Sequence, residues 1–198
     1  IKGLQQVIKA LPIILRDFPD TKVYVAGNNF VTKSGWRLNG FAKYINALMQ
    51  ANGVADKVRF TGVLSEEQMY KKYLSSHVLG WPSSIDNITN SICEAQLLGV
   101  PCVASYVGGI ADMITDGETG LLYRFEEVEM LAASVCEIFS EESLAFKLSE
   151  NAKRAAAVAR CGLGWLGSFD GLSNGWNCIA AVAVVGGTYS ITPPQAAP

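Results

Sequence analysis

Two carboxylates, Asp86 and Glu94, are separated by seven residues near the middle of the 198-residue chain. Asp86 lies in a loop that leaves a strand-like run, and Glu94 lies about one turn into the helix expected after it. Both can face one crevice at the carboxyl edge of a parallel sheet, which is where open α/β folds bind ligands. A carboxylate pair at this spacing is by itself more often solvated surface, so its surroundings decide its meaning.

The start of that helix has the chemistry of a phosphate site. The backbone amides near Asn90 and Ser91 lack partners within the helix and lie at the positive end of its dipole, which attracts phosphate oxygens. Glu94 can accept hydrogen bonds from two neighbouring hydroxyls, each worth about 1.5–3 kcal/mol when shielded from water. Ribose offers such a diol, so the segment suits a nucleoside diphosphate.

The elements that must position these residues alternate along residues 1–160. Apolar stretches of helical period and short β-branched runs follow one another, which is typical of βαβ units. We therefore predict an α/β fold, a Rossmann-like parallel sheet with helices on both faces. We expect helices over 4–18, 41–49, from 65, 92–98, 126–139 and 141–159, and strands over 22–26, 58–60, 77–80, 101–104 and 120–123.

Two helix starts carry capping signals. Residues 65–68 form the pattern of a capping box, in which Ser65 and Gln68 each satisfy a backbone N–H of the first turn. Ser140 is expected to be the N-cap of the last helix, with Glu141 and Glu142 favourably placed in its first turn.

Composition excludes several classes of partner. Sixteen Lys and Arg against eighteen Asp and Glu give a net charge of −2, so we expect no nucleic-acid partner. Five irregularly spaced cysteines predict a reduced, cytoplasmic setting and no metal site. No signal peptide is visible. The longest apolar run near the end, residues 178–185, is far shorter than the ~20 residues that cross a bilayer, so we expect no transmembrane segment.

The composition changes abruptly after residue 160. Residues 161–198 carry one charge, Asp170, together with seven glycines and two tryptophans. We therefore divide the chain into a domain of residues 1–160 and an atypical tail of residues 161–198. Two interpretations are equally good. In one, the tail is a non-native or frameshifted reading and is disordered. In the other, it is a hydrophobic tail that packs on the domain.

A longer motif surrounds the carboxylate pair. Asp86 to Glu94-Ala95 is followed by Gly99-Val100-Pro101, then by residues 107–112 with their Gly-Gly pair, and by residues 116–120 with Asp-Gly and a closing Gly. Together these residues resemble the signature of the retaining glycosyltransferases of family four, which have the two-domain GT-B fold. The resemblance covers residues 1–160 in order, and it implies the C-terminal, donor-binding domain of such an enzyme.

Roles for five residues follow from this resemblance. It implies that Glu94 holds the ribose hydroxyls and that Asp86 meets the hydroxyls of the donor sugar. The backbone amides of Asn90 and Ser91 would bind the diphosphate. Lys2 matches the phosphate-binding lysine of the family, although a lysine by itself is more often plain surface. The implied reaction displaces a nucleoside diphosphate from the sugar with retention at the anomeric carbon.

The resemblance also implies where the base lies and what else takes part. Backbone groups of Thr61, Gly62 and Val63 and of the Gly27-Asn28 turn would hold the base, and we expect UDP ahead of GDP. No metal and no further cofactor are implied. A saccharide or lipid-linked acceptor would bind to an N-terminal domain that this sequence lacks, so we expect the fragment alone to be inactive. That domain could also place the protein at the inner face of the membrane.

The sequence departs from the family pattern at three places. The first acidic position is usually Glu, and Asp86 is one methylene shorter. Residues 87–89 replace a Gly-Phe-Gly stretch. The strand that precedes Lys2 in the family is absent; because it belongs in the middle of the sheet, we expect unpaired backbone and a tendency to aggregate there.

Other functions remain open at this point. A UDP-sugar epimerase of GT-B type and a non-catalytic nucleotide-sugar-binding module are the alternatives. An NAD-dependent dehydrogenase is least favoured, because no Gly-x-Gly-x-x-Gly turn follows a first strand. The Gly108-Gly109 pair predicts equally a tight strand-to-helix turn and a lining of the sugar site.

Overall fold

A computed structural model of the chain describes residues 2–27, 40–87, 89–162 and 181–185. Within them a six-stranded sheet has the order β2-β1-β6-β3-β4-β5. Strands β1 to β5 are mutually parallel, and β6 is antiparallel to both of its neighbours. The strands are β1 (Lys22–Ala26), β2 (Val58–Gly62), β3 (Val78–Trp81), β4 (Cys102–Ser105), β5 (Leu121–Tyr123) and β6 (Ala181–Val185).

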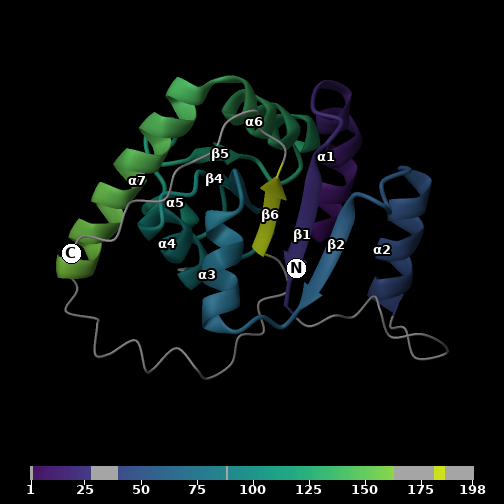
Figure 1. Cartoon of the computed structure of the whole chain (residues 1–198), viewed down its shortest axis with the longest axis horizontal. Coiled ribbons are helices and arrows are strands. Elements are labelled where there is room, and N and C mark those ends of the chain that lie inside the picture. The colour runs from purple at the N-terminus through teal and green to yellow at the C-terminus, as the bar shows by residue number, and fades with distance from the viewer. Residues whose placement is uncertain (1, 28–39, 88, 163–180, 186–198) are drawn as a thin grey trace.

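Seven helices within the described ranges cover the sheet (Figure 1). They are α1 (Leu4–Asp17), α2 (Gly40–Ala51), α3 (Glu66–Leu74), α4 (Asn90–Leu97), α5 (Ile110–Met113), α6 (Val128–Ser140) and α7 (Glu142–Gly162). Two hydrophobic clusters separate them into two layers. One cluster joins α1, α2, α6 and α7 to the sheet, and the other joins α3, α4 and α5 to it.

The two clusters follow from alternation along the central strands. Val78 and Val103 belong to the first cluster, whereas Leu79, Trp81 and Cys102 belong to the second. Successive side chains of a strand point to opposite faces, and all residues of β3 and β4 are buried. Strands of this kind need helices on both faces, which is the arrangement of a parallel sheet in an α/β protein.

The predicted fold class is confirmed. The five predicted strands and six predicted helices are present, with ends shifted by a few residues, and the capping box at Ser65 and Gln68 has both of its hydrogen bonds. The short helix α5 was not among the predicted elements. It follows the Gly108-Gly109 turn and has only four residues, too few for a periodic pattern.

The prediction that Ser140 is the N-cap of the last helix is wrong. Ser140 is the last residue of α6, and α7 begins at Glu142. Glu141 closes one helix and opens the next: its N–H donates to the carbonyl of Glu137 at 2.9 Å, and its carbonyl accepts from Ala145 N at 3.0 Å. A junction of one residue leaves no room for a serine cap.

The prediction of unpaired backbone in the middle of the sheet is also wrong. β6 lies between β1 and β3, with Ala183 opposite both Tyr24 and Leu79 (Figure 1, yellow arrow). Five residues of the atypical tail thus supply a central strand. The rest of residues 163–198 lies outside the described residues, so the division of the chain at residue 160 and the nature of the tail stay predictions.

All five parallel strands end at the same edge of the sheet, and the loops that carry the predicted site follow from it. Figure 1 shows β2 running toward this edge and β6 running away from it. Among the described residues, none of the helices combines the length and the apolar composition needed to cross a membrane.

Replacing Ala183 by proline tests the central strand. Ala183→Pro removes one ladder hydrogen bond and leaves an acceptor on a neighbouring strand unpaired, so we expect a loss of about 1–3 kcal/mol in the free energy of unfolding. Ala183→Gly is the control, because glycine keeps the N–H and costs only about 0.5–1 kcal/mol. Urea unfolding followed by circular dichroism measures both. Equal midpoints for the two variants would show that β6 does not pair.

Candidate functional site

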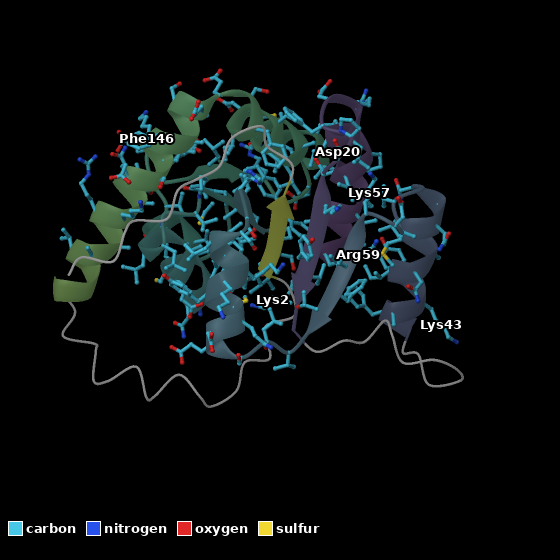
Figure 2. All side chains as sticks on the ribbon, viewed as in Figure 1. Lys2, Asp20, Lys43, Lys57, Arg59 and Phe146 are labelled. Carbon is cyan, nitrogen blue, oxygen red and sulfur yellow. The ribbon has the colours of Figure 1, made fainter. Side chains whose placement is uncertain are left out.

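Lys2 and Asp86 form an ion pair at the carboxyl edge of the sheet. The Lys2 Nζ atom lies 2.9 Å from Asp86 Oδ2, although the two residues are 84 positions apart in sequence. Their side chains are 28% and 14% exposed, so the pair is partly shielded from water. Figure 2 shows Lys2 at the lower edge of the sheet, below β6. Two residues predicted separately therefore meet in one place.

A close backbone approach brings Lys2 to this position. Gly3, the N-cap of α1, has φ +68°, and a Cβ built there would lie 1.4 Å from the carbonyl oxygen of Pro82, which follows β3. Only glycine allows this contact, because it has no Cβ and accepts a positive φ. The start of the chain therefore passes directly against the loop that carries Asp86.

The Asp86 carboxylate accepts hydrogen bonds at both of its oxygens. Oδ2 accepts from Trp81 Nε1 at 3.0 Å as well as from Lys2, and Oδ1 accepts from the Asn87 N–H at 3.2 Å. The Lys2 Nζ also lies 5.0 Å from the centroid of the Trp81 ring, within the range of a cation–π contact. Asp86, Lys2 and Trp81 thus form one cluster of mutual contacts.

The Gly108-Gly109 turn packs against the backbone of Asp86. A Cβ on Gly108, which has φ +50°, would lie 1.9 Å from the Asp86 carbonyl oxygen. That same oxygen accepts a hydrogen bond from Gly109 N at 3.3 Å. The glycines therefore serve as a tight turn that fixes the loop of Asp86 from the β4 side.

The N-terminus of α4 follows the same loop. Thr89 is its N-cap but makes no side-chain cap bond, and the first turn contains no acidic residue. Ser91 is buried and Asn90 is exposed. The absence of negative charge from this turn keeps the helix end attractive to an anion.

Glu94 lies one turn further along α4 and is half-buried. Burial raises the pKa of its carboxyl to about 7; the hydrogen bond from the Tyr73 hydroxyl, at 3.4 Å, lowers the pKa, and the charge of Glu66 raises it. A carboxylate held this way is poorly hydrated. It gains more from two hydroxyl donors than an exposed carboxylate does.

The residues predicted to hold the base lie at the ends of β1 and β2. Gly27 N donates to the carbonyl of Gly62 at 3.0 Å, and the Thr61 hydroxyl lies 3.1 Å from that same oxygen and 3.3 Å from the carbonyl of Val25. Val63, just beyond β2, is 62% exposed. Asn28, the other half of the predicted turn, lies outside the described residues.

The structure therefore divides the predicted site into two groups on one edge. Lys2, Asp86 and the start of α4 gather after β3, and Gly27 and residues 61–63 gather after β1 and β2, with β6 between β1 and β3. The part of the chain that the structure describes contains no group of three or more His, Cys, Asp and Glu residues that could hold a metal.

Sequence reasoning missed two partners of the site, Trp81 and Tyr73. Trp81 ends β3 and reads as core, and Tyr73 sits on α3 as one apolar position of a helix; both are buried. The Trp81 indole N–H donates a hydrogen bond to Asp86, and the Tyr73 hydroxyl donates one to Glu94. The available signal was the type of residue, because a buried Trp or Tyr usually gives its N–H or O–H a partner.

Comparison with known proteins gives one family. The family described as "Glycosyl transferases group 1" matches residues 1–155. Among curated relatives, the D-inositol 3-phosphate glycosyltransferase of Mycolicibacterium gilvum is 28% identical over 179 residues, which is 88% of this chain and 38% of the relative. The GDP-mannose-dependent alpha-(1-6)-phosphatidylinositol monomannoside mannosyltransferase of Mycolicibacterium smegmatis is 24% identical over 83% of this chain and 40% of its own.

Solved structures agree on the fold. The C-terminal domain of the group 1 glycosyl transferase LpcC from Francisella tularensis matches with a TM-score of 0.68 at 20% identity, over 79% of this chain and 78% of that one. Anabaena HepE in complex with UDP matches with the same TM-score and identity, over 79% of this chain and 41% of that one. The chain spans about two fifths of the length of these longer proteins.

Replacing Gly108 by alanine tests the packing of the turn on Asp86. The new Cβ must push the Asp86 backbone away, so we expect Gly108→Ala to lose about 1–3 kcal/mol more in the free energy of unfolding than a matched control. Gly117→Ala is that control, because Gly117 also has a positive φ, +71°, but has open space around its Cβ position. Denaturant unfolding measures both, and equal losses would contradict the packing role.

Proposed function

Since the chain belongs to the group 1 glycosyl transferases and has the fold of their C-terminal GT-B domain, we propose that its carboxyl edge binds the nucleoside diphosphate sugar that the reaction consumes. The observation that carries the proposal is the contact of Lys2 with Asp86, four residues before α4 and eight before Glu94. One edge of the sheet is then lined by the Lys2 cation, the Asp86 carboxylate, the N-terminus of α4 and the half-buried carboxylate of Glu94.

Each of these groups is proposed to bind one part of the donor. The amides of Asn90 and Ser91 and the ammonium of Lys2 bind the diphosphate, because both present positive charge. Glu94 accepts hydrogen bonds from the ribose hydroxyls, and Asp86 accepts them from the sugar. As the bond between sugar and phosphate breaks, negative charge grows on the diphosphate, and pre-oriented donors stabilise it.

The base is proposed to lie over the ends of β1 and β2. Gly27, Thr61 and Gly62 offer backbone groups there, and exposed Val63 offers apolar contact. We propose UDP ahead of GDP as the carrier. HepE binds UDP, but the mannosyltransferase of M. smegmatis depends on GDP-mannose. A titration with a UDP-sugar and a GDP-sugar therefore distinguishes the two carriers.

The acceptor site is proposed for the whole parent protein and not for this chain. Because the relatives are more than twice as long as this chain, we propose that a saccharide or lipid-linked acceptor binds elsewhere in the parent protein and receives the sugar with retention. A cytoplasmic location of that protein is part of the same proposal.

Calorimetric titration of the full chain with UDP-glucose, GDP-mannose and ADP-glucose tests the donor site. One of them should bind, and Glu94→Ala should weaken it by roughly tenfold or more, because two hydrogen bonds to the ribose are lost. Glu66→Ala, which removes an exposed carboxylate near Glu94, should not weaken binding: it lowers the pKa of Glu94, so the affinity at pH 7 should rise by no more than about twofold. If the folded chain binds none of the three, the proposed donor site is wrong.

Affinity for the sugar nucleotide should rise with pH. Glu94 accepts hydrogen bonds from both hydroxyls only when it is ionised, and its pKa is raised to about 7, so the ionised fraction grows as the pH rises through that value. Between about pH 6 and pH 8 the affinity should increase about tenfold. In Glu94→Gln the same titration should be nearly flat. A wild-type profile without slope, or an equal slope in both proteins, would contradict the role of Glu94.

A further inference from the structure

Trp81 contacts both charged members of the site from within the core. It is the last residue of β3, is 1% exposed and belongs to the hydrophobic cluster under α3, α4 and α5. Its indole N–H donates to Asp86 Oδ2 at 3.0 Å, and its ring lies 5.0 Å from Lys2 Nζ. A ring fixed by packing therefore directs its one polar group at the loop carboxylate.

The two donors that meet at Oδ2 differ in stiffness. The Lys2 ammonium sits on a flexible four-carbon chain that is 28% exposed, and it is free to turn toward another anion. The Trp81 indole has two side-chain torsions, both restricted by a buried ring. The tryptophan contact therefore defines the orientation of the carboxylate, and the lysine contact is exchangeable.

We propose that Trp81 is a positioning residue for Asp86. Its indole N–H holds the carboxylate in the orientation that accepts the hydroxyls of the donor sugar, and keeps it there when Lys2 turns from Asp86 to the diphosphate. If that N–H were missing once Lys2 had turned away, the one donor left to the carboxylate among the described residues would be the Asn87 N–H, which belongs to the same loop and moves with it. The inference rests on the proposed function, because it names what orients a residue of the same site.

The test compares sugar nucleotides with the corresponding nucleoside diphosphates. For the full chain, calorimetry gives the Kd of the diphosphate divided by the Kd of its sugar derivative, using UDP with UDP-glucose and GDP with GDP-mannose. The free diphosphate also carries one more negative charge than its sugar derivative, but this difference is the same for each variant. The change in the ratio between wild type and variant therefore reports the contribution of the sugar, on which Asp86 acts. Trp81→Phe keeps an aromatic ring below Lys2 and removes the N–H.

Three further variants separate positioning from stability. Leu79→Val alters a buried residue of the same strand and cluster, whose aliphatic side chain forms no hydrogen bond or ion pair. Asp86→Ala removes the carboxylate, and the double variant combines it with Trp81→Phe. Thermal unfolding reports how far each change destabilises the fold.

We expect Trp81→Phe to lower the ratio about fivefold or more, while the affinity for the diphosphate alone changes less than about twofold. Leu79→Val should leave the ratio unchanged, although it destabilises the fold to a degree similar to Trp81→Phe. In the Asp86→Ala background, Trp81→Phe should have no further effect on the ratio, because the two residues act as one unit.

Two results overturn the proposal in different ways. If Asp86→Ala lowers the ratio but Trp81→Phe keeps it, or if Trp81→Phe lowers it equally with and without Asp86, Trp81 does not position that carboxylate and the proposed function stands. If Asp86→Ala leaves the wild-type ratio unchanged, or the wild-type chain binds neither the diphosphates nor their sugar derivatives, the role of Asp86 fails and the positioning role fails with it.

Discussion

The Asp86 carboxylate is the point at which three distant parts of the chain meet. The carboxylate accepts hydrogen bonds from Lys2, at the start of the chain, and from Trp81, at the end of β3. The backbone carbonyl of Asp86 accepts one from Gly109, in the Gly108-Gly109 turn after β4. Burying a charge in this way is unfavourable unless it is paired and hydrogen-bonded. These contacts together fix the shape of the loop, and the proposed site depends on that shape.

Backbone sterics hold the same region together. Gly3 lies against Pro82 and Gly108 against Asp86, at distances that no residue with a Cβ could adopt. These contacts attach the beginning of the chain and the β4 loop to the exit of β3. The proposed site is thus supported by close backbone packing at two glycines.

β6 adds a second kind of dependence. It joins β2 and β1 to β3, β4 and β5, so the two groups of site residues share a sheet through it. Because it is antiparallel, it satisfies the neighbouring backbone groups without a crossover helix. The residues proposed for the base and those proposed for the sugar phosphate keep their relative places through this strand.

Sequence alone determined the described elements other than α5 and β6, and it determined the candidate residues, because periodicity and turn chemistry are local. The alternation of helices and strands, the capping box at Ser65 and the motif around Asp86 and Glu94 could all be read from neighbouring residues. Tertiary structure alone decided that Trp81 and Tyr73 bind the two carboxylates, that Glu141 joins α6 to α7, and that β6 fills the centre of the sheet. These contacts join residues whose separation or burial leaves no local pattern, so only the packed chain specifies them.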